Sequence, residues 1–237
     1  MLLSILMPVY DEKATVLQVV ARVLAVEFLC EVELVIVDDG STDGTPALLD
    51  ALVDPRLRVL HHPANAGKGA AIRTAAAQAR GDWMIICDAD QEYLPEEIPS
   101  LLAPVLDGRS QVVYGTRAFG SHNAYSFWYV MGNKGVNLAA NVLFNAYLSD
   151  LETCFKLLPL GLYRSLDVQS QGFGMEAEIT GKLLARGIRP FEVPISYHAR
   201  SRAEGKKLTW RDGVEAVWIL GRERVVGRRR TPVAATA

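Results

Sequence analysis

Apolar runs alternate with amphipathic segments along the first half of the chain. Short apolar runs that predict strands lie at Leu3–Met7, Val32–Val37, Leu57–Leu60, Trp83–Cys87 and Val112–Tyr114. Helical patterns occupy the intervals, with apolar stripes or start signals at Val16–Val23, Thr45–Pro46, Ala70–Ala79 and Pro95–Leu106. Because strand and helix alternate, short crossovers predict a Rossmann-like, mostly parallel twisted sheet flanked by helices on both faces. The pattern therefore indicates the α/β class.

Composition agrees with one compact domain. The chain has 237 residues, of which 50% are hydrophobic and 22% charged, enough for a full core. We expect a single domain over residues 1–230 and a disordered tail over 231–237. The net charge of −2 argues against a nucleic-acid partner.

Cysteine usage and the first residues bear on location. The three cysteines lack metal or redox spacing, and their odd number suits a reducing compartment. The chain enters a strand directly, without a basic leader, and no run of eighteen apolar residues occurs. We therefore expect a cytoplasmic protein, either free or peripheral on the inner face of the cell membrane.

Two carboxylates follow the fourth predicted strand, which ends at Cys87. Asp88 and Asp90 point the same way if the segment is extended, and they lie at the carboxyl edge where open α/β sheets bind ligands. Carboxylates at that edge suit Mg²⁺ or Mn²⁺ beside nucleotide phosphates. On these residues alone, an Asp pair that caps the next helix or is solvated in a loop fits equally well.

Other ligand classes for such a sheet fit less well. The first strand is followed by Pro8-Val9-Tyr10-Asp11-Glu12, without the glycines of a dinucleotide-binding turn. Gly67-Lys68-Gly69 lacks both the spacing of a phosphate loop and the Ser or Thr after the lysine. A phosphatase nucleophile would be expected after the first strand rather than the fourth. A nucleotide-sugar site fits best.

Four motifs at the ends of successive predicted strands carry a family resemblance. They are Pro8–Glu12, Val37–Asp43, Asn65–Gly69 and Asp88–Glu92. In this order they resemble the family 2 glycosyltransferases of the GT-A fold, over nearly the whole chain. The resemblance implies a nucleotide-sugar-binding half at 1–117 and an acceptor-side α+β extension at 118–230.

Within that family, the chain is most similar to the polyprenyl-phosphate sugar synthases, the dolichyl-phosphate mannose or glucose group. The segments that carry this likeness are Tyr114–Arg117, Ser149–Lys156, Gly172–Glu178 and Arg200–Lys207. Glu92 stands where many members have Gln, and the C-terminal membrane spans of many members are missing here. The likeness implies metal-dependent, inverting transfer of a hexose from GDP-mannose or UDP-glucose to a polyprenyl phosphate. The alternatives are transfer to a saccharide hydroxyl in cell-wall or exopolysaccharide synthesis, and a non-catalytic nucleotide-sugar-binding module.

Candidate donor-side residues follow from the loops. The base and ribose are assigned to Pro8, Tyr10, Glu12 and Asp39, the phosphates to Lys68, and the rest of the nucleotide site to Asp88, Ala89 and Asp90. Asp90 and Glu92 are the best candidate ligands for Mg²⁺ or Mn²⁺, with Asp88 directed at the metal, its water, the ribose or the sugar. An ordinary turn with a solvated lysine fits the Lys68 segment equally well.

Acceptor chemistry decides whether a base is needed. A sugar hydroxyl needs a positioned base, whereas a phosphate monoester, with a second pKa near ~6, is already ionised at pH 7. A phosphate would be held by cations, for which the candidates are Arg117, Arg200, Arg202, Lys206 and Lys207. For a hydroxyl acceptor, Asp150 and Glu152 are the candidate catalytic carboxylates, beside Asp88, Asp90 and Arg117. A solvated basic loop is the alternative for residues 200–207.

Aromatic residues gather in Tyr125–Leu148, a segment too polar to span a bilayer. It fits a helix in the membrane interface, and Glu215–Leu220 with the arginines that follow fits a second one. Ordinary core packing and a homodimer surface are together equally good explanations. Peripheral membrane association and dimerisation both stay open.

Overall fold

The computed structural model describes residues 1–123, 126–172, 174–200 and 210–227. Its central sheet has seven strands in the order β3-β2-β1-β4-β6-β5-β7. The strands are β1 (Leu2–Val9), β2 (Glu31–Asp38), β3 (Leu57–His61), β4 (Trp83–Ile86), β5 (Val113–Thr116), β6 (Lys156–Pro159) and β7 (Phe191–Pro194). The five strands expected from the apolar runs are confirmed, and β6 and β7 are additional.

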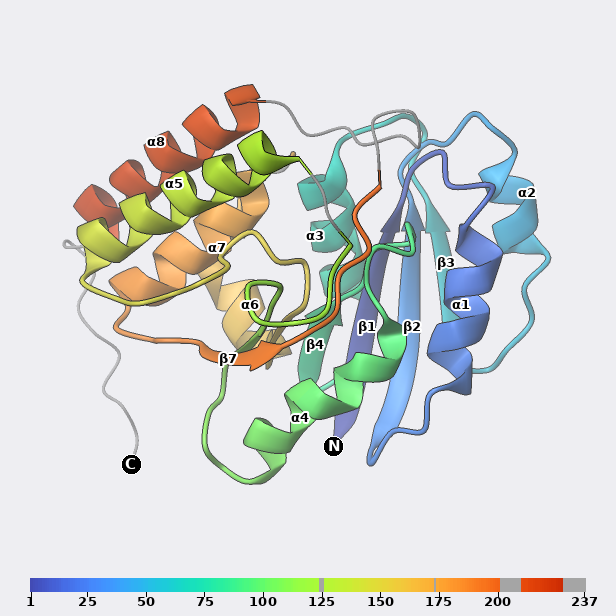
Figure 1. Ribbon diagram of the computed structural model, residues 1–237. Helices are drawn as coiled ribbons and strands as arrows, with labels where there is room; N and C mark the ends of the chain where they lie inside the picture. Colours follow the sequence, from blue (N-terminus) through green and yellow to red (C-terminus); the bar gives the residue numbers. More distant parts are fainter. Residues whose placement is uncertain (124–125, 173, 201–209, 228–237) are drawn as a thin grey trace.

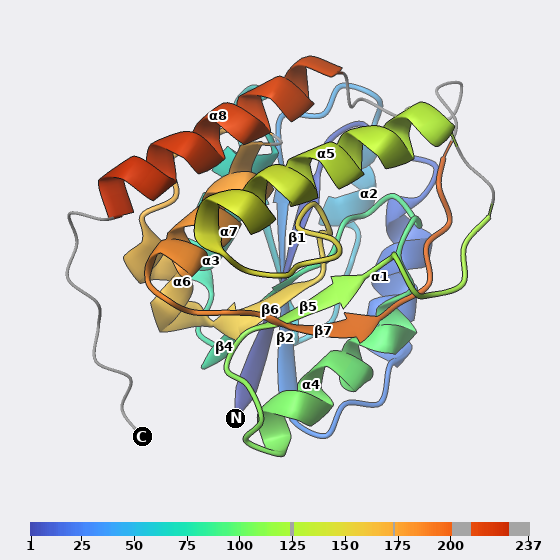
Figure 2. The same cartoon turned by 60° about the vertical axis from the view of Figure 1, so that its left-hand side comes forward.

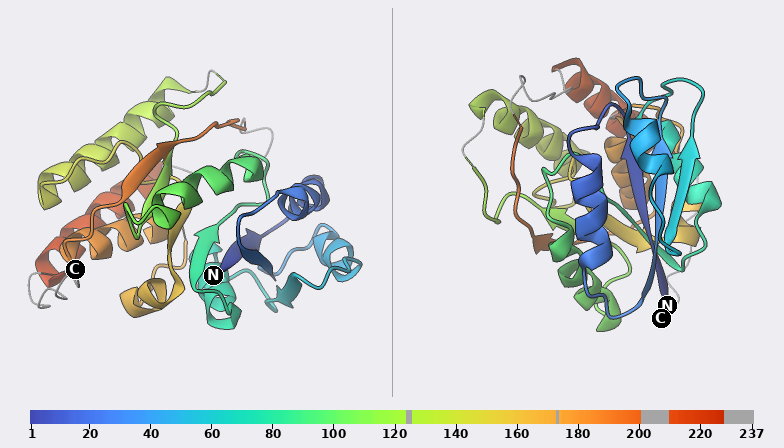
Figure 3. Two further views of the ribbon diagram at one scale, coloured as in Figure 1. Left: turned by 90° about the horizontal axis from the view of Figure 1, so that it is seen from below. Right: turned by 90° about the vertical axis from the view of Figure 1, so that its right-hand side faces the viewer.

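Helices cover both faces of the sheet, as predicted (Figures 1 and 3). They are α1 (Val16–Ala25), α2 (Thr45–Asp50), α3 (Lys68–Gln78), the 3₁₀ turn η1 (Pro95–Glu97), α4 (Ile98–Leu106), α5 (Phe127–Phe144), α6 (Leu160–Leu166), α7 (Gly174–Ala185) and α8 (Trp210–Gly227). The face with α1 and α4 lies opposite the face with α3 and α6. Helix α2 begins at Thr45, within the predicted start signal Thr45–Pro46, and Gly44 precedes it in the left-handed region.

The chain adds β2 and β3 on one side of β1 and then β4 on the other side, so the strand order reverses between β1 and β4. Strand β1 pairs in parallel with β2 on one side and with β4 on the other, so the loops after these strands diverge and leave a crevice. The sheet is mostly parallel, as predicted, but β6 runs antiparallel between β4 and β5. Because β6 is antiparallel to β4 and β5, it begins at the edge of the sheet where the parallel strands end. The segment before it, residues 149–155, is thereby brought to the crevice.

The hydrophobic core has two parts. The larger follows the sheet, where residues such as Ile5, Ile36 and Ile85 are fully buried because helices cover both faces. The smaller lies between α5, α7 and α8, around alanines such as Ala140 and Ala216 that let the helices approach closely. This second core places α8 beside the crevice.

Helices α5 and α8 lie side by side on the outside of the molecule (Figure 2). One face of α5 is core, with Val136 and Ala140 buried, while Trp128 is 80% exposed. On α8, Trp218 is 64% exposed. Core packing therefore explains only part of the aromatic segment. None of the helices in the described ranges is long and apolar enough to cross a membrane.

Candidate active site

A cavity of about 320 Å³ occupies the crevice between the carboxyl ends of β1 and β4. It extends from Asp39 on the β2 side to Asp212 and Ala216 on α8. The residues expected from the sequence that line it are Pro8, Tyr10, Glu12, Asp39, Lys68, Asp88, Ala89, Asp90, Glu92, Arg117, Glu152 and Arg200. Asp150 does not line the cavity, and Arg202, Lys206 and Lys207 lie outside the described residues. Most of the predicted donor and acceptor groups thus share one cavity.

Asp39 is buried, and hydrogen bonds to its carboxylate hold the loop that follows β3. Its carboxylate accepts hydrogen bonds from the backbone N–H groups of Ala66 at 3.0 Å and Gly67 at 2.7 Å. The ring nitrogen Nδ1 of His62 lies 2.7 Å from the same carboxylate. Base recognition by Asp39 stays a prediction, and the structure adds that this residue shapes the loop beside it.

The glycines beside Lys68 are required by close chain packing. A Cβ atom at Gly67 or Gly69 would overlap carbonyl oxygens of the segment 169–171, and the N–H of Gly69 donates to one of those carbonyls at 2.6 Å. The carboxylate of Glu178 in α7 holds this segment by accepting hydrogen bonds from the backbone N–H groups of residues 169 and 170. The N–H of Gly69 is therefore already paired and is not available to a phosphate.

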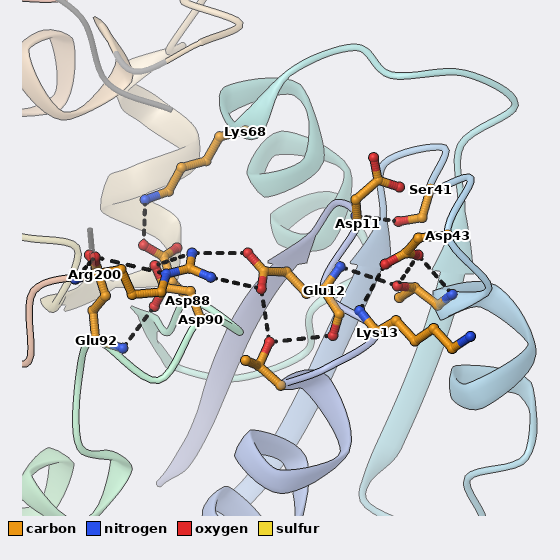
Figure 4. A network of polar contacts seen from close by, with 12 residues as sticks. Asp11, Glu12, Lys13, Ser41, Asp43, Lys68, Asp88, Asp90, Glu92 and Arg200 are labelled. Atoms are coloured by element: carbon orange, nitrogen blue, oxygen red, sulfur yellow. Dashed lines mark hydrogen bonds and ion pairs between the residues drawn. The ribbon is translucent and has the colours of Figure 1, made fainter. Parts of the chain in front are cut away.

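Lys68 and Arg200 supply the positive charge among the strand-end carboxylates (Figure 4). The Lys68 ammonium lies 2.8 Å from Asp88, and the Arg200 guanidinium lies 3.2 Å from Asp90. Burial, and then the nearby charges of Asp88 and Glu92, raise the pKa of Asp90 to about 7, against the lowering effect of Arg200. The strand-end carboxylates therefore carry more negative charge than Lys68 and Arg200 balance.

Arg200, which the sequence assigned to the acceptor, contacts Glu12 and Asp90, which the sequence assigned to the donor. Its guanidinium makes two contacts with Glu12, at 3.0 and 3.1 Å, and its backbone N–H donates to Glu92 at 2.9 Å. The hydroxyl of Tyr197 donates to the other oxygen of Glu92 at 2.8 Å. Glu92 thus anchors the chain after β7 across the site, a long-range contact without a local sequence signal.

The predicted metal ligands can be tested against this arrangement. Within the described ranges, no three His, Cys, Asp or Glu side chains are already grouped around a common metal position. Asp88 and Asp90 nevertheless present hard oxygen donors from one short segment, and the charges of Asp88 and Glu92 add to burial in raising the pKa of Asp90. The donor set therefore fits Mg²⁺ or Mn²⁺, and the assignment of Asp88, Asp90 and Glu92 as ligands stays a prediction.

Arg117 and Asp150 form a buried ion pair directly after β5. Nε and Nη2 of Arg117 donate to the two carboxylate oxygens at 2.6 and 2.7 Å, and the guanidinium lies 4.9 Å from the ring centroid of Tyr197. This paired geometry fixes the arginine plane. Asp150 lies behind Arg117, so it positions the arginine, which itself faces the cavity.

Glu152 faces the cavity beside Arg117. Burial raises the pKa of Glu152 to about 7, with Arg117 acting to lower it and Asp150 to raise it further. A carboxyl with this pKa exchanges a proton near neutral pH, as a general base must.

Glu176 was not singled out from the sequence, although it lies within the segment 172–178 that carried the resemblance. Its carboxylate lines the cavity and lies 3.0 Å from the Lys68 ammonium. Lys156 is likewise buried, and burial lowers its pKa to about 8. It donates to the carbonyl of Leu151 at 2.8 Å and so holds the loop before β6. No local pattern distinguishes these residues from ordinary helix and strand positions.

Comparisons with known proteins identify the family of the chain. The model of the family described as Glycosyl transferase family 2 matches residues 4–163. The polyprenol monophosphomannose synthase of Mycolicibacterium smegmatis is 29% identical over 219 residues, covering 85% of this chain and 79% of that protein. The dolichol-phosphate mannosyltransferase of Mycosarcoma maydis is 27% identical over 216 residues, covering 86% and 72%. The low-salt glycan biosynthesis hexosyltransferase Agl6 of Haloferax volcanii is 29% identical, but the chain spans only 48% of its length.

Solved structures share the fold. Glucosyl-3-phosphoglycerate synthase from Mycobacterium tuberculosis, in complex with Mn²⁺, UDP-glucose and phosphoglyceric acid, superposes with a TM-score of 0.69 at 22% identity, covering 92% of this chain and 79% of that one. Staphylococcus aureus TarS 1-349 with UDP-GlcNAc gives a TM-score of 0.65 at 16% identity, covering 94% and 66%. At these identities the likeness extends to the architecture alone.

Proposed function

Since the chain belongs to glycosyl transferase family 2 and has the GT-A fold, we propose that it moves a hexose from a nucleoside-diphosphate sugar to a polyprenyl phosphate. The observation that carries the proposal is that one continuous cavity runs from the strand-end carboxylates past Arg117 to α8. The names of two relatives, a polyprenol monophosphomannose synthase and a dolichol-phosphate mannosyltransferase, support the lipid phosphate as acceptor.

The donor would lie over the ends of β1 and β4. Pro8, Tyr10 and Asp39 line the part of the cavity assigned to the base and ribose. Asp88 and Asp90, with Glu92, would hold Mg²⁺ or Mn²⁺. Such a cation, when bound, stabilises negative charge on a departing nucleoside diphosphate.

The acceptor would lie against Arg117. An ionised phosphate oxygen would attack the anomeric carbon as the bond from that carbon to the diphosphate oxygen breaks, and one such displacement inverts the configuration. No proton has to leave the acceptor at neutral pH, because the monoester is already largely dianionic. Arg117 is suited to hold this phosphate because Asp150 keeps its guanidinium in one plane.

The lipid chain would reach the cavity from the side of α5 and α8. The cavity ends at Asp212 and Ala216 of α8, and the same two helices expose Trp128 and Trp218. Tryptophan rings suit the boundary between headgroups and acyl chains. We therefore place the protein peripherally on a membrane, with self-association through this face as the alternative.

Transfer to a saccharide hydroxyl is the second candidate, and one observation favours it. Glu152, whose pKa burial raises to about 7, faces the cavity where a hydroxyl acceptor would lose its proton. A phosphate acceptor has no need of such a base.

The test compares acceptors and variants in one assay. A radiolabelled donor is offered with a short-chain polyprenyl phosphate or with saccharides, using wild type, Arg117→Ala, Arg117→Lys and Glu152→Gln. With the lipid phosphate, we expect Arg117→Ala to raise the acceptor KM, Arg117→Lys to recover part of the loss, and Glu152→Gln to retain turnover. Product formed with saccharides alone, together with a loss of orders of magnitude in kcat for Glu152→Gln, would favour the second candidate.

A further inference from the structure

Tyr197, in the chain that follows β7, contacts one candidate residue for each substrate. It lines the cavity and is 3% exposed. The face of its ring lies over the guanidinium of Arg117, at 4.9 Å from ring centroid to Cζ, and its hydroxyl donates to Oε2 of Glu92 at 2.8 Å. We assign Arg117 to the acceptor phosphate and Glu92 to the cation beside the donor. One side chain therefore connects the two assignments.

The ring of Tyr197 is itself held in place. The backbone N–H of Tyr197 donates to the carbonyl of Ser121 at 2.8 Å. The ring of Tyr93 packs against that of Tyr197 edge to face, with centroids 5.4 Å apart and planes at 63°. The Tyr93 hydroxyl in turn accepts the N–H of Cys154 at 3.2 Å. A side chain held from its backbone and from its ring can position the residues that it contacts.

The ring supports Arg117 without neutralising it. Asp150 sets the plane of the guanidinium by accepting two hydrogen bonds from one edge, and the Tyr197 ring supports that plane from one face. The electron-rich face of an aromatic ring attracts a cation, most strongly where water is excluded. A ring carries no net charge and accepts none of these N–H hydrogen bonds, whereas a second carboxylate would do both. The stacking therefore leaves the arginine able to bind an anion.

The hydroxyl of Tyr197 acts on Glu92 in a different way. Figure 4 shows Glu92 beside Arg200, at the strand-end carboxylates. The Tyr197 hydroxyl occupies one carboxylate oxygen, and the backbone N–H of Arg200 donates to the other at 2.9 Å. Each oxygen of a carboxylate has two lone pairs, so these contacts orient Glu92 and leave it able to bind a cation. Groups that orient a metal ligand in this way contribute to metal affinity.

We propose that Tyr197 is a positioning residue for both substrates, with its ring holding Arg117 for the acceptor phosphate and its hydroxyl holding Glu92 for the cation. This inference rests on the proposed function, and it adds a residue whose two parts act on different ligands. Removing the hydroxyl and removing the ring should therefore have separate effects.

The first experiment tests the ring. Dissociation constants of a short-chain polyprenyl phosphate are measured by calorimetry on the full chain, without metal or nucleotide. Tyr197→Leu, which removes the ring, should weaken binding roughly 5- to 30-fold, whereas Tyr197→Phe, which keeps it, should stay within about twofold of wild type. In an Arg117→Ala background, Tyr197→Leu should cost less than about twofold, because the ring acts through the arginine.

The second experiment tests the hydroxyl. Binding of Mn²⁺ in the presence of UDP or GDP is followed by electron paramagnetic resonance. Tyr197→Phe should weaken Mn²⁺ binding by roughly 10-fold, although it spares the lipid phosphate. Tyr163→Phe is the matched control, because it removes a buried hydroxyl on α6 that has no hydrogen-bond partner among the described residues. It should leave both affinities unchanged.

Each part of the proposal can fail separately. Equal losses from Tyr197→Leu with and without Arg117 would overturn the role of the ring, and unchanged Mn²⁺ affinity in Tyr197→Phe would overturn the role of the hydroxyl. If Tyr197→Leu does not fold, progressively fluorinated phenylalanines at position 197 keep the ring and weaken its attraction for a cation, so lipid-phosphate affinity should fall with fluorination. Constant affinity across that series would also overturn the role of the ring. Failure of wild type to bind the polyprenyl phosphate would instead overturn the proposed function.

Discussion

Replacement of Glu152 by Gln should stabilise the protein at alkaline pH. Burial raises the pKa of this carboxyl from 4.5 to about 7, so between those pH values the folded protein keeps a proton that the unfolded chain has released. The free energy of unfolding therefore falls as pH rises through this window. Each pKa unit corresponds to 1.36 kcal/mol, so the 2.5-unit difference amounts to up to about 3 kcal/mol at pH 8.

Urea unfolding of wild type and Glu152→Gln at pH 4.5, 6, 7 and 8 measures this difference. The two proteins should be nearly equal at pH 4.5, where the carboxyl is largely protonated in the folded state, and the variant should gain steadily above it. Glu96→Gln is the control with the opposite sign, because the Arg22 ion pair lowers the pKa of Glu96. A difference between wild type and Glu152→Gln that is constant with pH, or that shrinks as pH rises, would refute the reasoning.

Three further outcomes can be checked. Asp90→Asn is nearly isosteric and should keep the circular-dichroism spectrum while losing orders of magnitude in metal-dependent turnover, and full activity at limiting Mn²⁺ would contradict the metal assignment. Gly69→Ala places a Cβ against the carbonyl of Ser170 and should cost about 1–3 kcal/mol in thermal unfolding, whereas Gly161→Ala, with open space at its Cβ, should not destabilise the protein. Burial acts to raise the pKa of Glu178, but the ion pair with Lys182 and hydrogen bonds from the backbone lower it to about 2. The ionised carboxylate therefore contributes stability that is lost as pH falls from 4.5 toward 2. Glu178→Gln should therefore cost about 3 kcal/mol in urea unfolding at pH 7 and much less at pH 3, and a loss independent of pH would contradict this.

The framework of residues 1–117 could be predicted from local patterns. Uninterrupted apolar runs such as Val32–Val37 mark strands that are covered on both faces, and the helical stripes between them imply the crossovers. Parallel strands bring their carboxyl ends to one edge, so the sequence alone predicts that Asp39 and Asp88 lie at a common site. The cavity that they line confirms this expectation.

The strands that follow residue 117 were less predictable. Strand β6 contains a lysine and ends on a proline, and β7 is only partly buried, so neither shows the apolar run by which β1 was recognised. Lys156 is tolerated inside the sheet because backbone carbonyls accept from its ammonium. That compensation comes from the loop before β6 and is not visible in the pattern of the strand.

The partners of the charged site residues depended on packing between distant parts of the chain. Arg200 was assigned to the acceptor, but it contacts Glu12, 188 positions away, because β7 returns the chain to the carboxyl edge of the sheet. Lys68 was assigned to phosphate, yet Asp88 and Glu176 meet it once α7 packs on α3. Hydrophobic periodicity and turn chemistry act between near neighbours in sequence and so specify the elements and their order. The pairing of buried charges depends on which elements pack together in the folded chain. Local sequence patterns do not specify such contacts between distant segments.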